Sequence, residues 1–162
     1  MINVSAEDLR DAAKNPTLVL GLMWQMVRLQ LLGNINLMSF PELIKLLKDG
    51  EEMGELLALD PEVLLKRWVN YHMEKQNYPR RIKNFGNDLK DAKVYTVLLK
   101  SIGDTMSIQE GQGCTMEMLK WNDFKRANQV LVTARNLGVT PFLTENDILK
   151  GDDKFNLALS FQ

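Results

Sequence analysis

The chain has 162 residues, of which 45% are hydrophobic and 25% charged, a composition typical of a globular protein with one ordinary core. Lys and Arg number 20 against 21 Asp and Glu, and the net charge of −1 gives no electrostatic reason to expect nucleic acid or an anionic membrane as a partner. One Cys and one His exclude an internal disulfide, a cysteine zinc site and a two-histidine metal site, so we expect no metal, no cofactor and a binding module rather than an enzyme.

The first long helix is predicted over residues 16–32, because Pro16 suits a first helical position and Gly33 suits a helix end. This helix is apolar nearly all round, which is typical of a helix in a core or an interface. It is too short and too polar to span a bilayer, and residues 2–15 are too charged for a secretory segment, so we expect a cytoplasmic protein.

Two short helical segments are predicted next. Ser39 and Glu42 have the spacing of a capping box, which predicts a short helix to about Lys48. A further helical turn is expected over residues 51–57.

The strongest helix start lies at residues 60–62, where an aspartate cap precedes a proline and a glutamate. That helix is expected to end near Lys75. A second helix, capped by Asp91, is expected to end before Gly103, and residues 103–121 are expected to form a long connection.

The clearest amphipathic pattern begins after a cap at residue 122 or 123 and ends at Gly138. Thr144 is expected to cap a short helix that stops at Gly151, and a last helix follows to the chain end. Period-2 alternation is missing over any convincing length, so an all-α fold is predicted. The expected core residues are Leu64, Leu65, Trp68, Phe85, Val94, Leu98, Ala127, Val130, Leu131, Ala134 and Ile148.

Four features have a structural and a functional interpretation. Trp68 is expected in the core rather than on a ligand, and His72 is expected to pack or to lie on the surface rather than to catalyse. Cys114, in a glycine-flanked loop, is expected to be an inert exposed thiol. The basic residues at 80–83 suit a solvated loop better than an RNA or phosphoinositide site.

The two ends of the chain resemble each other. VSAEDLRDAAKNPTLVLGL and LTENDILKGDDKFNLALSF each have a hydroxyl cap, Ser5 or Thr144, followed by an acid, an aliphatic residue and an apolar helix. The spacing is too long for a solenoid and suits two tandem domains, of which only the tail of the first is present.

Several of these segments resemble the calponin-homology domain family. LLKRWVNYHM followed by RIKNFGNDLKDAKVYTVLLKSI resembles the opening of such a domain, with a buried Trp68 and a turn at Asn84 and Phe85. KRANQVLVTARNLGVTPFLTENDIL resembles its central helix and the segment after it. The chain has Asp91 and Ala92 where the family often has Asp-Gly, and its loop at residues 111–113 is divergent.

The remaining segments resemble paired domains of the fimbrin, or plastin, family. NPTLVLGLMWQMVRLQLL is similar to the last helix of a preceding calponin-homology domain, and INLMSFPELIKLLKDGEEMGELLALDPEVLL is similar to the inter-domain linker. The resemblance implies a compact bundle of four main helices plus short connecting helices, with an N-terminal helical extension. It divides the chain into a preceding domain's tail (1–32), a linker with short helices (33–60) and one calponin-homology domain (61–162).

The resemblance also implies binding to F-actin in the cytoplasmic actin cytoskeleton, next to a neighbouring calponin-homology domain of the same protein. Most of a first domain, the EF-hands and a second actin-binding domain are absent, so this chain is expected to bind weakly or to regulate. The alternative is a scaffold or regulatory domain that binds a protein other than actin. A homodimer through residues 16–32 is a further expectation. The implied actin-binding residues are Thr17, Leu18, Gly21, Leu22, Gln25, Arg28, Leu29, Lys66, Arg67 and Asn70.

Overall fold

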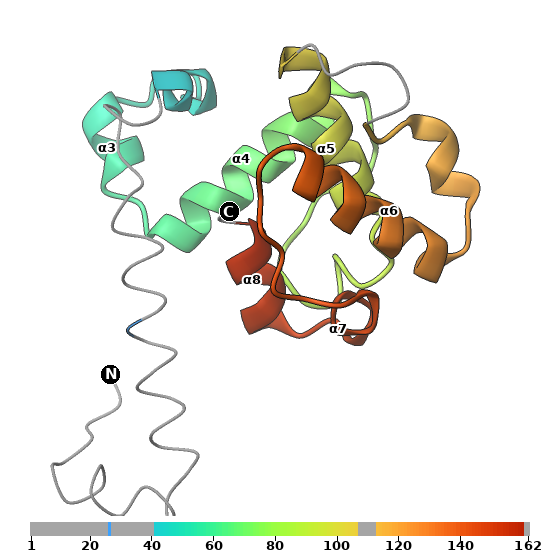
Figure 1. Cartoon of the computed structure of the whole chain (residues 1–162). Helices are drawn as coiled ribbons and strands as arrows, with labels where there is room; N and C mark the ends of the chain where they lie inside the picture. Colours follow the sequence, from blue (N-terminus) through green and yellow to red (C-terminus); the bar gives the residue numbers. More distant parts are fainter. Residues whose placement is uncertain (1–25, 27–40, 107–112, 161–162) are drawn as a thin grey trace, which may run out of the picture.

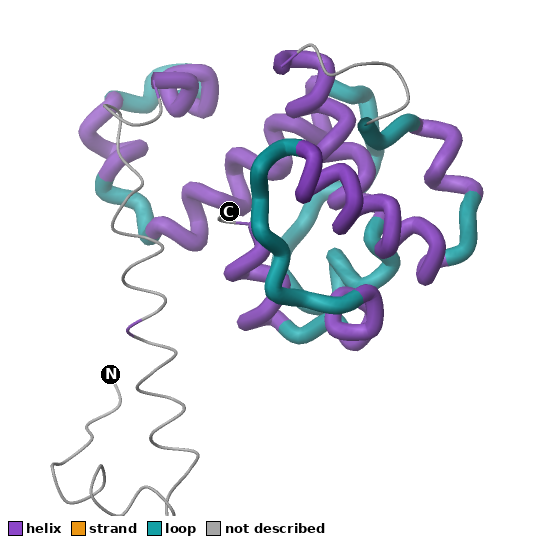
Figure 2. The backbone as a smooth tube through the Cα atoms, viewed as in Figure 1, coloured by secondary structure: helices purple, strands orange, loops and turns teal. Residues whose placement is uncertain are grey.

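The computed structural model describes residue 26, residues 41–106 and residues 113–160. Within these residues every regular element is a helix, which confirms the expected all-α class (Figures 1 and 2). The predicted helix over residues 16–32 lies outside the described residues apart from Met26, which is helical and exposed. The elements, labelled as in Figure 1, are η1 (Pro41–Leu46), α3 (Met53–Leu57), α4 (Pro61–Lys75), α5 (Lys93–Met106), η2 (Met116–Lys120), α6 (Asp123–Asn136), α7 (Glu145–Lys150) and α8 (Asp153–Ser160).

The helix starts follow the predicted caps. The Asp60 carboxylate accepts a hydrogen bond from the backbone N–H of Glu62 at the start of α4, and the Asn122 side chain accepts one from Lys125 at the start of α6. Thr144 begins α7 with a reciprocal capping box. These side chains pair N–H groups that the first helical turn leaves unpaired, so each helix begins at its cap.

Two glycines end helices in the left-handed conformation that favours glycine. Gly138 follows α6 with φ of 88°, and Gly151 follows α7 with φ of 71°. Gly151 also lies close to Gly86. A Cβ added to Gly86 would lie 2.8 Å from the carbonyl oxygen of Gly151. The loop before α5 and the turn before α8 therefore pack backbone against backbone.

The structure corrects two helix predictions. The segment after residue 40 is a 3-10 helix that ends at Leu46 rather than a helix to about Lys48. Gly103 is buried inside α5 instead of lying beyond its end. The helix continues because its last turn is held from outside: the Lys75 ammonium donates to the Thr105 hydroxyl, and the Gln76 side-chain amide donates to the Asp104 carboxylate. A glycine inside a helix costs only about 1 kcal/mol, which such contacts offset.

The expected 103–121 connection is also shorter than predicted, because η2 occupies its second half. Cys114 precedes η2 and is buried, so the expectation of an exposed thiol is wrong. Its sulfur contacts the Thr133 hydroxyl at 3.5 Å, and burial raises the pKa of the Cys114 thiol.

The helices enclose two hydrophobic clusters on either side of Trp68. The larger one joins α4, α5, α6 and the C-terminal helices, and the smaller one packs Leu43, Leu46 and Leu56 on Leu64 of α4. Trp68 is half-buried and contacts both clusters. The other ten residues expected in the core are between 0% and 6% exposed.

Ala92, in the last turn before α5, has an unusual backbone conformation. It is fully buried, and its φ of 56° lies in the left-handed region that a side chain with a Cβ disfavours. The turn is held by its neighbours: the Ala92 N–H donates to the Leu89 carbonyl oxygen, and the Ala92 carbonyl oxygen accepts from the N–H and hydroxyl of Thr96.

Candidate interaction site on α4

A cleft of about 480 Å³ lies between η1, with the turn after it, and one face of α4. The sequence analysis placed three site residues on this helix, and all three line the cleft. Its lining residues are Lys45, Leu46, Leu47, Lys48, Val63, Lys66, Arg67, Asn70, Tyr71 and Glu74.

Arg67 is held by the end of η1 and the turn after it. Its guanidinium lies 2.5 Å from the Glu51 carboxylate, and both side chains are less than one-fifth exposed. The same guanidinium nitrogen donates to the Leu46 carbonyl oxygen at 3.4 Å. The hydrogen bond from Arg67, followed by that from the Lys48 backbone N–H, lowers the pKa of Glu51. Arg67 therefore fixes the segment after η1 onto α4 above the smaller hydrophobic cluster.

Asn70 is likewise engaged inside the fold. Its side-chain oxygen accepts from the Ile82 N–H at 2.7 Å, and its amide nitrogen donates to the Ile82 carbonyl oxygen at 3.1 Å. Ile82 itself is buried in the larger cluster. This two-way contact ties the loop that follows α4 back onto the helix, which is a structural role that spacing along the helix does not reveal.

Lys66 differs from these two neighbours. Its ammonium lies 3.7 Å from the Glu62 carboxylate one turn earlier, and the two side chains are 26% and 31% exposed. Exposed ion pairs of this kind contribute little to stability, so a partner can compete for the lysine at small cost.

Seven other predicted site residues lie outside the described residues: Thr17, Leu18, Gly21, Leu22, Gln25, Arg28 and Leu29.

His72 lies on the buried side of α4. Its Nδ1 is 2.7 Å from the Ser101 hydroxyl oxygen of α5, and its ring makes edge contacts with Trp68 and Tyr71. The ring is 4% exposed. These contacts are those of a packing histidine that joins α4 to α5, as the sequence analysis expects.

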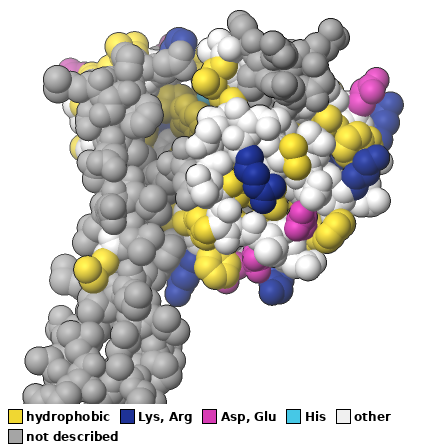
Figure 3. All heavy atoms as spheres, in the orientation of Figure 1, with side chains coloured by type: hydrophobic (Ala, Val, Ile, Leu, Met, Phe, Trp, Pro, Cys, Tyr) yellow, Lys and Arg dark blue, Asp and Glu magenta, His cyan; other side chains and the backbone are white. Residues whose placement is uncertain are grey.

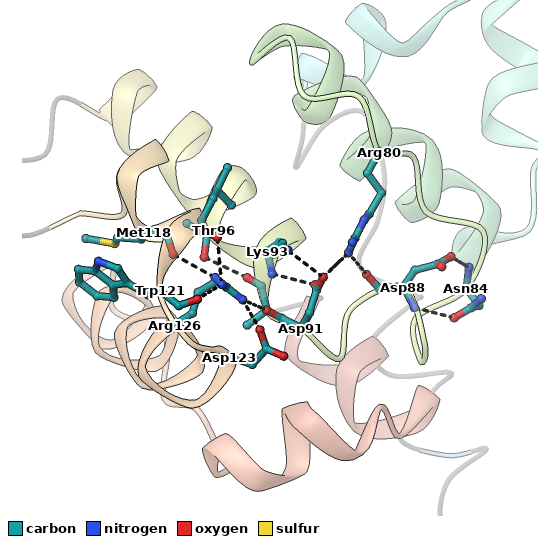
Figure 4. Close-up of polar contacts among 12 residues, drawn as sticks. Arg80, Asn84, Asp88, Asp91, Lys93, Thr96, Met118, Trp121, Asp123 and Arg126 are labelled. Atoms are coloured by element: carbon teal, nitrogen blue, oxygen red, sulfur yellow. Dashed lines mark hydrogen bonds and ion pairs between the residues drawn. The ribbon is translucent and has the colours of Figure 1, made fainter.

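A polar network centred on α6 was missed by the sequence analysis (Figure 4). At its centre Arg126 of α6 is 1% exposed, and its guanidinium donates to the backbone carbonyl oxygens of Met118, Leu119, Trp121 and Asp91 and to the carboxylate of Asp123. One signal was present in the sequence: Arg126 stands four residues before Val130, on the apolar face of the helix. An arginine there must find internal acceptors.

The network extends through Asp91 to the loop after α4. The Asp91 carboxylate accepts from Arg80 at 2.9 Å and from the Lys93 N–H at the start of α5. Although partial burial opposes it, the hydrogen bond that Arg80 donates to the Asp91 carboxylate raises the pKa of Arg80. Arg81 donates to the carbonyl oxygens of Tyr78 and Arg80. The basic residues at 80–83 thus include two arginines that hold their own loop.

Beyond the cleft, the face in Figure 3 mixes charged and hydrophobic side chains and shows no large area of one sign. No group of three or more His, Cys, Asp or Glu within the described ranges is placed to hold a metal ion. Among the helices that the structure describes, none is long and apolar enough to cross a membrane.

Comparison with known proteins places these features in a family. Residues 59–162 match the family described as the calponin homology (CH) domain. Mouse Plastin-1 is 40% identical over 161 residues, and Dictyostelium discoideum Fimbrin is 40% identical over 158; each match covers 98% of this chain. The crystal structure of the actin-crosslinking core of Schizosaccharomyces pombe fimbrin aligns with a TM-score of 0.74 at 32% identity, over 99% of this chain and 29% of that one. The chain spans about a quarter of the length of these curated relatives.

Proposed function

The chain belongs to the calponin homology domain family, and we propose that it is a non-catalytic, actin-filament-binding module of a fimbrin-like cross-linking protein. One observation carries this proposal: the fimbrins and plastins match nearly the whole chain, including the residues before the calponin homology domain. Cross-linking needs two filament-binding sites, so this module is proposed to supply one weak or regulatory contact.

We also propose the domain division that the resemblance implies. Residues 1–32 would be the tail of a preceding calponin homology domain, residues 33–60 the linker, and residues 61–162 the second domain. The family match beginning at residue 59 supports the last boundary. The smaller hydrophobic cluster supports a linker that is packed on α4 rather than loose. F-actin and the neighbouring domain are the proposed partners, in the cytoplasmic actin cytoskeleton.

The proposed filament contact on α4 centres on Lys66, whose charge is the most accessible of the three predicted residues. Arg67 and Asn70 would support it by holding the linker and the following loop in place. Leu18 and Leu22 of the N-terminal segment are proposed to add apolar contacts. A homodimer through residues 16–32 would cover the same apolar side chains, so dimerisation would compete with filament binding.

Co-sedimentation with F-actin over a range of salt concentrations tests this function. Wild type should bind saturably, and Lys66→Glu should weaken binding about fivefold because it places a negative charge at the rim of the contact. Lys100→Glu is the matched control: Lys100 is also 26% exposed and also pairs with an acid one turn away on its helix. It should leave binding unchanged.

Failure to saturate, or equal loss in both variants, would contradict filament binding through α4. Binding no better than that of a protein with a scrambled surface would leave the alternative function, a calponin homology scaffold that binds a protein other than actin. Light scattering of the wild-type chain over a concentration series measures the proposed homodimer.

A further inference from the structure

Neither the family match nor the predicted actin contact assigns a ligand to the cleft between η1 and α4. We propose that it docks an acidic, extended peptide segment of a protein partner. The proposal concerns a different property from filament binding, because it holds whether or not that partner is actin.

The charge of the cleft favours an acidic occupant. Its lining side chains include four cations, Lys45 and Lys48 from the linker and Lys66 and Arg67 from α4, and one anion, Glu74. Lys66 and Arg67 each also meet one acidic partner, Glu62 and Glu51, so cations still outnumber these anions. The chain as a whole has a net charge of −1. This local excess of positive charge is therefore a property of the cleft, and it complements a partner segment rich in Asp or Glu.

The apolar part of the lining favours a peptide over a small anion. Leu46 and Leu47 of the linker side and Val63 and Tyr71 of α4 line the same cleft. A volume of about 480 Å³ is enough to receive several side chains of an extended segment. An acidic segment with an interspersed leucine would use both halves of the lining.

A compact phosphate ligand fits the same residues less well. The Arg67 guanidinium, which is the group best shaped for phosphate, is already paired with Glu51 at 2.5 Å. The lysines are divided between the two walls of the cleft, Lys45 and Lys48 on the η1 side and Lys66 on α4, rather than gathered on one helix turn. The cations of the cleft are separated from one another and lie beside apolar lining residues. Carboxylates spaced along a peptide match this arrangement better than a single phosphate group does.

The test is a titration of the whole chain, observed by amide NMR, with an acetylated and amidated peptide of sequence EDLEEDLEE. Saturable binding should shift amide signals of residues 45–48 and 63–74, and added salt should weaken it. The neutral peptide QNLQQNLQQ is the matched control and should bind at least about tenfold more weakly. A second titration with inositol hexakisphosphate tests the phosphate alternative.

Two double variants assign the site. Lys45→Glu with Lys48→Glu should reduce peptide affinity at least about tenfold, because it reverses both linker charges. Lys83→Glu with Lys90→Glu changes the net charge equally at exposed residues outside the cleft and should leave affinity unchanged. Circular dichroism melting confirms that each variant is folded.

No saturable peptide binding by wild type, equal loss in both variants, or inositol hexakisphosphate binding in place of the peptide would each overturn the proposal. The F-actin assay separates it from the proposed function. Peptide binding lost only in the linker variant supports the cleft even where wild type fails to sediment with F-actin. Filament binding without peptide binding supports only the proposed function.

Discussion

At the scale of single residues, the molecule places its charged groups in two different ways. Arg126 is buried and surrounded by backbone carbonyl oxygens, whereas Lys66 is held loosely at the surface by one exposed ion pair. The first arrangement stabilises the fold because the charge is fully hydrogen-bonded inside it. The second leaves a charge available to a partner. The sequence analysis named Lys66 as a contact residue and assigned no role to Arg126, because the internal acceptors of Arg126 become visible only in the folded structure.

Replacing Arg126 with Met should therefore be severely destabilising. The variant leaves the carbonyl oxygens of Met118, Leu119 and Asp91 without their donor, and we expect the free energy of unfolding to fall by about 3 to 5 kcal/mol. Urea unfolding followed by circular dichroism measures it. Arg135→Met, at an exposed position of the same helix, should change stability by less than about 0.5 kcal/mol. Similar losses in both variants would contradict the role given to Arg126.

At the scale of elements, local signals predicted helix starts better than helix ends. Asp60, Asn122 and Thr144 cap the helices they were expected to cap, because the interaction lies within three residues. The end of α5 was missed because long-range contacts override the local preference of Gly103. Lys75 and Gln76 at the end of α4 bond to the last turn of α5, and no pattern within α5 contains that information.

The capping box of α7 predicts a pH dependence of stability. Hydrogen bonds from the Thr144 hydroxyl and then from its backbone N–H lower the pKa of Asp147 below its ordinary 3.8. The stabilisation by Asp147 is therefore full above the unfolded-state pKa and is lost as the pH falls through the lower pKa of the folded state. Asp147→Asn should lower the unfolding free energy at pH 7 and approach wild type as the pH falls below the folded-state pKa of Asp147.

Urea unfolding of wild type and Asp147→Asn at several pH values measures this convergence. Thr144→Ala removes the partner hydroxyl and should cost about 1 kcal/mol at neutral pH. A stability difference between wild type and Asp147→Asn that stays constant down to pH 2 would show that the carboxylate does not act through its ionised form.

At the scale of the whole molecule, residues 41–57 of the proposed linker are part of the folded structure. The smaller hydrophobic cluster and the Arg67–Glu51 pair join it to α4. The sequence analysis predicted a linker with short helices, and its helical turns are described, but its attachment to α4 depends on residues 16 positions apart. Pairings at that distance have no periodic signature, and for the same reason the cleft between the linker and α4 was not predicted.

Weakening the Arg67–Glu51 ion pair should make the proposed linker open more often while the rest of the fold is unaffected. Glu51→Gln removes the charge that Arg67 meets, so amide hydrogen exchange over residues 43–57 should accelerate several-fold while α5 and α6 keep their protection. Exchange measured by mass spectrometry provides the comparison, with Glu117→Gln as an exposed control. Unchanged exchange in the linker would indicate that the hydrophobic cluster alone holds it.

The left-handed backbone at Ala92 has a consequence for which sequences can occupy this fold. Glycine would relieve the backbone strain, and alanine fills the buried space with one methyl group. A larger side chain would meet both the conformational penalty and the surrounding core. Among natural variants of this chain, position 92 should therefore alternate between the two smallest amino acids, while the flanking Asp91, whose carboxylate accepts from Arg80 and from the Lys93 N–H, should stay unchanged.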